Sequence, residues 1–166
     1  MDTGLRKKNA LVLSSSRGLG LGIAEALADE GANVLLTGRS EDRLKENVLR
    51  INKKGQGKAE YACIDLNDRE SVSVLERNVR EVFGGADILI NNTGGPPPGK
   101  MVDADINTLP EQIEAMVTRI IQITDMIIPH MRAQQWGRIV TIGSSGLIQP
   151  IPVSYTHLTL PTIYSV

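Results

Sequence analysis

The chain of 166 residues has a single cysteine, no long apolar run and almost no net charge. Cys63 cannot form an internal disulfide, which favours a reducing compartment. It lies in the apolar run 61–64, where we expect it to be buried as a small hydrophobic residue. Because 18 basic residues stand against 19 acidic ones, no electrostatic reason exists to expect nucleic acid or an anionic membrane as a partner. A small-molecule ligand fits this balance better.

The apolar stretches are too short for a transmembrane helix, and the one after residues 1–8 is too short for a signal peptide. We therefore expect a cytoplasmic protein, in which the sequon at 91–93 would not meet a glycosyltransferase. The length and a hydrophobic content of 41% are sufficient for one domain with its own core.

Short β-rich runs alternate with helix-length segments along the chain. Strands that alternate with helices in one sheet run parallel, with right-handed crossovers between them. The sequence therefore predicts an α/β fold, a doubly wound parallel sheet with helices on both faces. The expected strands are 10–13, 33–37, 59–64, 87–91 and 138–143.

Polar residues mark where the helices should begin. Ser40 can cap a helix that runs to residue 52, Asn67 and Glu70 resemble a capping box before a helix ending at residue 83, and Thr108 precedes the longest helix, 109–131. That last helix has an unusually broad apolar face, which either packs entirely in the core or contributes in part to a subunit contact. Its members are Ile113, Met116, Val117, Ile120, Ile121, Thr124, Ile127 and Ile128.

The first strand leads through a turn of small residues directly into an amphipathic helix. The turn, from Ser14 to Gly20, has little side-chain bulk, so backbone amides and the positive end of the helix can approach a pyrophosphate closely. Gly22 lies one turn into the helix, where we expect it to permit tight packing on the sheet. This pattern favours a dinucleotide ligand.

Three further segments are expected at the same edge of the sheet, because ligands of open parallel sheets bind outside the carboxyl ends of the strands. These segments are 37–39, 91–95 and 142–146. Gly38 and Arg39 follow the second strand, so this position has no acid to accept hydrogen bonds from an adenosine ribose, and Arg17 projects from the turn. Two guanidinium groups at these places favour NADP over NAD. Asp65, after the third strand, either accepts from the adenine amino group or begins a helix cap.

These motifs resemble those of the short-chain dehydrogenase/reductase family, of the classical type that includes 3-oxoacyl-[acyl-carrier-protein] reductases and glucose dehydrogenases. The resemblance covers about residues 6–152 and is carried by segments 10–20, 87–94 and 137–144. It implies a Rossmann-type sheet in an NADP-dependent oxidoreductase that reduces a carbonyl compound or oxidises a secondary alcohol. It also implies that Asn91 and Gly94 hold the sheet end and the cofactor, and that Ser144 is catalytic, bonding the substrate oxygen.

The residues expected around the cofactor come from the first three of these four segments and from the end of the third strand, and no metal site is expected. They are Ser14, Ser16, Arg17, Gly18, Leu19, Gly20, Arg39, Asp65, Leu66, Asn91, Thr93 and Gly94.

The chain also departs from the family pattern. Ser14 replaces the first glycine of the turn, which suggests a less strained turn, and Met116 stands where the family usually places an asparagine. The family's Tyr-x-x-x-Lys pair is replaced by His157 and Pro161, and a phenol without a neighbouring cation is a poor acid near neutral pH. We therefore expect this chain to be inactive or impaired. The alternative is a non-catalytic NADP-binding scaffold or regulatory protein.

The last fourteen residues, 153–166, carry no charge and no helical apolar pattern. We expect them to be foreign to the fold, so that 1–152 is a partial NAD(P)-binding domain, incomplete at its C-terminus, from a longer parent protein that is a homo-oligomer. In this chain the fifth strand would then form an exposed edge that favours aggregation.

Overall fold

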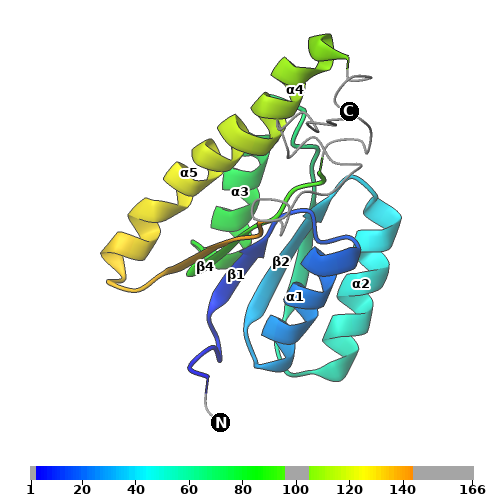
Figure 1. Ribbon diagram of the computed structural model, residues 1–166. Helices are drawn as coiled ribbons and strands as arrows, with labels where there is room; N and C mark the ends of the chain where they lie inside the picture. Colours follow the sequence, from blue (N-terminus) through cyan, green and yellow to red (C-terminus); the bar gives the residue numbers. More distant parts are fainter. Residues whose placement is uncertain (1–2, 96–104, 144–166) are drawn as a thin grey trace, which may run out of the picture.

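The computed structural model describes residues 3–95 and 105–143, and within them five parallel strands form one sheet (Figure 1). The spatial order is β3-β2-β1-β4-β5. This confirms the predicted doubly wound parallel sheet. The strands are β1 (Asn9–Val12), β2 (Asn33–Gly38), β3 (Ala59–Cys63), β4 (Ile88–Asn91) and β5 (Arg138–Thr141).

Helices cover both faces of the sheet, as expected (Figure 1). One face packs against α1 (Gly18–Asp29) and α2 (Glu41–Lys54) through Val12, Val34 and similar residues, all buried. The other face packs against α3 (Ser71–Phe83) and α5 (Arg119–Ala133) through the alternate strand residues. A short 3₁₀ turn, η2 (Ile106–Thr108), the short helix α4 (Leu109–Ile113) and a π-helical turn, η3 (Glu114–Thr118), lead directly into α5.

The chain reverses direction across the sheet at β1. From β1 it proceeds to β2 and β3 on one side, and then returns to β4 and β5 on the other. At such a switch point the crossovers diverge to opposite faces and leave a crevice outside the carboxyl ends of the central strands. This crevice is where the turn after β1 and the loop after β4 meet.

The predicted position of the helix start is correct for α2 and wrong for α3. Ser40 precedes α2, although its side chain makes no capping bond. The capping box of Asn67 and Glu70 does not form, because α3 begins at Ser71. Instead the backbone amide of Asn67 donates to the Asp65 carboxylate and that of Glu70 to the Asp68 carboxylate. These two local turns delay the helix.

Cys63 is exposed, so the expectation that it is buried was wrong. β3 pairs only with β2 and is an edge of the described sheet. Tyr61, two residues before Cys63 and on the same face, already reaches Glu41 at the start of α2 with its hydroxyl. Cys63 therefore lies beyond the end of that helix, where nothing covers it fully.

The broad apolar face predicted for 109–131 is only partly used by the core. Of its members only Ile127 is buried, and it packs against the sheet together with Ile123 and Met131, which the prediction left out. A second stripe, formed by Ile113, Val117 and Ile121, is 50–56% exposed. Within the described ranges, no helix has the length and apolarity needed to cross a membrane.

Candidate coenzyme site

A cavity of about 720 Å³ lies at the carboxyl ends of the strands. It is formed by the turn after β1, the ends of β2 and β3, the loop after β4, and the helical segment around η3. Ten of the predicted cofactor residues line it: Ser14, Ser16, Arg17, Gly18, Leu19, Arg39, Asp65, Leu66, Thr93 and Gly94. The topology therefore brings three of the four predicted segments together with the end of β3. Of the fourth, 142–146, only Ile142 and Gly143 are described, and neither lines the cavity.

The Ser15 hydroxyl, the Ser14 backbone amide and Thr37 hold the turn after β1 against β2. The Ser15 hydroxyl is fully buried, donates to the Val12 carbonyl at 2.7 Å and accepts from the Thr37 amide at 2.9 Å. The Ser14 amide donates to the Thr37 hydroxyl at 3.1 Å. Sequence reasoning valued these serines for their small size and missed their role as bridges, because the partner is more than twenty residues away.

Ser14 adopts a left-handed backbone conformation, with φ of 48°. A residue with a side chain pays about 1–2 kcal/mol for this region, which glycine enters freely. The expectation of a less strained turn was therefore wrong. The turn keeps the backbone shape that suits a glycine while carrying a serine.

Gly20, and not Gly22, is the glycine that permits close packing. A Cβ on Gly20 would lie 2.5 Å from the Ser14 carbonyl oxygen and 2.8 Å from Asn92 Nδ2. The Asn92 amide in turn donates to the carbonyls of Leu13 and Ser14, at 3.3 and 3.2 Å. A Cβ on Gly22 would meet no atom of the described residues within 4 Å, so the role expected for Gly22 was wrong. Gly20 supports the floor of the cavity without lining it.

Two arginines flank the cavity near its β2 side. Arg39 Nη1 lies 3.9 Å from Asp65 Oδ2, with 71% and 41% of the two side chains exposed. A contact of this kind is weak, which leaves the Arg39 guanidinium available to an anionic ligand. Asp65 also closes the turn to Asn67 and caps no helix. Arg17 is exposed and lines the same cavity.

Asn91 lies beneath the cavity and does not line it. Its side chain is buried, and Nδ2 donates to the Thr124 hydroxyl of α5 at 3.3 Å and to the Thr141 hydroxyl of β5 at 3.4 Å. Its Oδ1 has no hydrogen-bond partner among the described residues. Asn91 therefore joins β4, β5 and α5 at the sheet end.

Met116, in the π-helical turn, lines the cavity where the family usually places an asparagine. A thioether is at most a weak acceptor and cannot donate a hydrogen bond. Ser144, His157, Pro161 and the segment 153–166 lie outside the described residues. Among the residues that the structure does describe, no group of three or more His, Cys, Asp or Glu side chains could hold a metal ion.

The geometry and the sequence agree with one protein family. The model of the short chain dehydrogenase family matches residues 8–156. The chain belongs to this family of oxidoreductases, whose members share the Rossmann-type sheet.

Individual relatives support the assignment. An uncharacterised oxidoreductase of Staphylococcus saprophyticus is 34% identical over 140 residues, covering 84% of this chain and 60% of the relative. A 3-oxoacyl-[acyl-carrier-protein] reductase of Aquifex aeolicus is 33% identical over 144 residues, covering 87% and 58%. L-Sorbose reductase of Gluconobacter frateurii, solved with NADPH and L-sorbose, superposes with a TM-score of 0.88 at 33% identity, covering 94% and 59%. The chain therefore spans about three fifths of the length of these proteins.

Proposed function

We propose that the chain is the coenzyme-binding part of an NADP-dependent carbonyl reductase or secondary-alcohol dehydrogenase, similar to the 3-oxoacyl-[acyl-carrier-protein] reductases. The observation that carries this proposal is the exposed guanidinium of Arg39 at the end of β2, whose contact with Asp65 is a long one of 3.9 Å. A 2′-phosphate carries the charge that suits this position. The solved L-sorbose reductase, which holds NADPH, supports the same choice of coenzyme.

The residues present fit a dinucleotide. The cavity is open at the N-terminus of α1, and the absence of a side chain at Gly20 keeps Ser14 and Asn92 in place below it. Amides of the turn from Ser14 to Gly20 would hold the pyrophosphate, while Arg39 and Arg17 would hold the 2′-phosphate. When bound, the reduced nicotinamide would donate a hydride to a carbonyl carbon, and the oxidised nicotinamide would accept one from the carbon of a secondary alcohol.

The chain lacks the residues that the family uses for proton transfer to or from the substrate oxygen. Ser144 is proposed to bond the substrate oxygen, but the family's tyrosine and lysine are replaced by His157 and Pro161. Loss of general acid–base catalysis lowers a rate by about 10²–10⁴-fold. We therefore propose that this chain binds NADP and turns over little. The alternative function, a non-catalytic NADP-binding scaffold, is favoured by Met116, which removes a further polar group from the cavity.

Coenzyme titration tests the proposal. Binding of NADPH and NADH is measured by the change in their fluorescence, on the wild type and on R39Q. Removing a charged hydrogen-bonding partner of the phosphate is worth about 1.5–3 kcal/mol, so the preference for NADPH should fall by roughly tenfold or more. R43Q is the matched control, because Arg43 is exposed on α2 and does not line the cavity. Failure to bind either coenzyme would refute the proposal.

A second measurement separates the two functions. NADPH consumption is followed with a panel of ketones, using the same protein. Consumption above the background rate selects the oxidoreductase, and binding without any consumption selects the scaffold for this chain.

We also propose a homo-oligomeric parent protein in a reducing, cytoplasmic setting, acting on a small-molecule carbonyl or alcohol. The stripe of Ile113, Val117 and Ile121, at i, i+4 and i+8, is the surface proposed to face a second copy. The exposed thiol of Cys63 suits a reducing compartment. Residues 1–152 are proposed as the partial coenzyme domain and 153–166 as a segment outside the native fold.

A further inference from the structure

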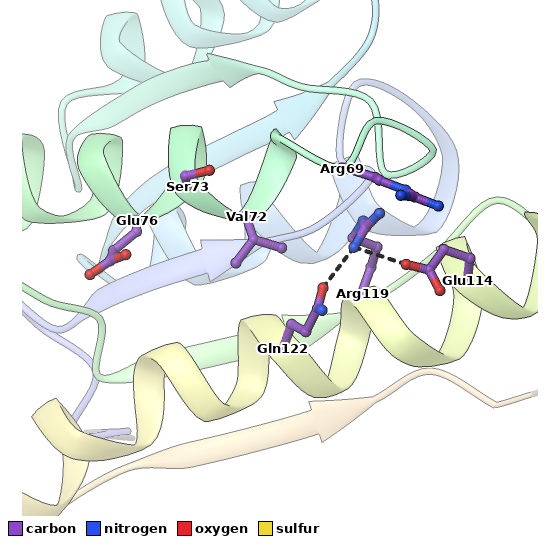
Figure 2. Close-up of a pocket in the computed structure, with 7 residues that line it drawn as sticks. All are labelled: Arg69, Val72, Ser73, Glu76, Glu114, Arg119 and Gln122. Carbon is purple, nitrogen blue, oxygen red and sulfur yellow. Dashed lines mark hydrogen bonds and ion pairs between the residues drawn. The ribbon is translucent and has the colours of Figure 1, made fainter.

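A second cavity, of about 530 Å³, lies between α3 and α5, outside the coenzyme site (Figure 2). Arg119, at the start of α5, and Arg69, in the loop before α3, both line it. Neither residue lines the coenzyme cavity. The function proposed above therefore gives this pair of cations no role.

Arg119 is a buried cation whose hydrogen bonds are incomplete. Only 3% of its side chain is exposed. Its Nη1 donates to Gln122 Oε1 at 2.7 Å and lies 3.1 Å from Glu114 Oε1. Its Nε and Nη2 are buried without a hydrogen-bond partner among the described residues. Leaving buried donors of a charged group unpaired is costly, so this arrangement points to a missing acceptor.

The unpaired atoms define what that acceptor should be. Nε and Nη2 lie along one edge of the guanidinium and present two roughly parallel N–H bonds. This is the edge that a carboxylate or a phosphate accepts with two oxygens. The exposed Arg69 lines the same cavity, and Figure 2 shows its side chain at the same end of the cavity as Arg119. Both guanidinium groups carry a positive charge that suits an anionic ligand.

The acidic groups of the cavity do not fill this role. Glu114 already pairs with Nη1 of Arg119, on the other side of the guanidinium. Glu76 pairs with Arg80 at 2.7 Å. Arg69 has no ion pair within the described residues. One edge of Arg119 and the whole of Arg69 are thus left for a ligand.

We propose that a small oxyanion, a carboxylate or a phosphate group, binds here between Arg69 and Arg119. The Nε and Nη2 atoms are shielded from solvent, so the side chains around them must shift for the anion to reach that edge. The proposed anion site shares no lining residue with the coenzyme cavity, so it can be tested separately from the proposed function.

Thermal unfolding in the presence of anions tests the site. Malonate and inorganic phosphate are titrated separately against sodium chloride of equal ionic strength. At least one of the two anions should raise the Tm in a saturable manner. A rise with malonate indicates a carboxylate ligand, and a rise with inorganic phosphate indicates a phosphate ligand. The absence of any rise beyond that of sodium chloride with either anion overturns the proposal.

Variants locate the bound anion. R119M should weaken the response by roughly tenfold or more, because it removes both unpaired donors. R69Q should weaken the Tm response by a smaller factor. The control R77Q removes one charge from an exposed position on α3 and should leave the Tm response unchanged. If R119M does not fold, R69Q measured against R77Q decides the outcome. An unchanged response in R69Q, or its loss in R39Q, would place the anion elsewhere and overturn the proposal.

Discussion

The substitution Gly20→Ala probes the packing that supports the coenzyme cavity. The added Cβ would lie 2.5 Å from the Ser14 carbonyl oxygen, 2.8 Å from Asn92 Nδ2 and 3.0 Å from Ser15 Cα. Two of these atoms are backbone, and the Ser15 amide is held by a 2.7 Å bond to the Thr37 carbonyl. The turn therefore has little freedom to move away.

The expected change in the free energy of unfolding follows from two destabilising effects and one stabilising effect. Overpacking of a tight contact costs about 1–3 kcal/mol, and displacing the Asn92 amide from its two carbonyl acceptors costs about 1 kcal/mol more. Replacing glycine by alanine in a helix recovers at most about 1 kcal/mol. We therefore expect G20A to lower the free energy of unfolding by about 1–3 kcal/mol, and to weaken NADPH binding because the turn is displaced.

Gly22→Ala is the matched control on the same helix. A Cβ there meets nothing within 4 Å, so only the gain in helix propensity remains. G22A should be more stable than the wild type by up to about 1 kcal/mol. Urea unfolding followed by circular dichroism measures both variants. The reasoning is refuted if G20A is as stable as the wild type, or if G22A loses as much stability as G20A.

Three further predictions concern other positions. S14G should raise the free energy of unfolding by up to about 1 kcal/mol in urea melts, because Ser14 has a φ of 48°, and a loss of stability would contradict that conformation. Cys63 should react with a thiol reagent in the folded protein as fast as an exposed model thiol, whereas reaction only after unfolding would restore the buried interpretation. The pKa of Glu41 lies below its ordinary value because Lys45, and then Tyr61, donate hydrogen bonds to its carboxylate. This contact therefore stabilises the fold fully at a pH above the ordinary pKa of a glutamate, and the stabilisation is lost as the pH falls through the lowered pKa. In an NMR titration K45M should raise the pKa of Glu41, and an unchanged pKa would argue against the contact.

Much of the architecture could be read from local patterns. Alternating strands and helices predicted the parallel sheet, and the small-residue turn before the first helix predicted where the cavity at the carboxyl ends of the strands lies. Arg39 could be placed at the cavity because it directly follows a strand, and the carboxyl ends of parallel strands share one edge. These features depend on residues that are neighbours in the chain, so sequence alone was sufficient.

Other features depend on contacts between distant segments. The sequence pattern assigned the close-packing role to Gly22, and only the approach of Ser14 and Asn92 showed that Gly20 is the glycine that must lack a side chain. Cys63 has an apolar local context, yet it is exposed because the strand extends beyond the helix that would cover it.

Arg119 is the clearest case of a property that tertiary structure decided. Its sequence position, within a largely apolar helix, gives no sign that its guanidinium is buried against α3 beside Arg69. Burial and the pairing of charges are set by whichever elements pack together across the fold. Local sequence determined the helices, strands and turns of this protein, while packing determined which of their side chains are strained, exposed or left without a partner.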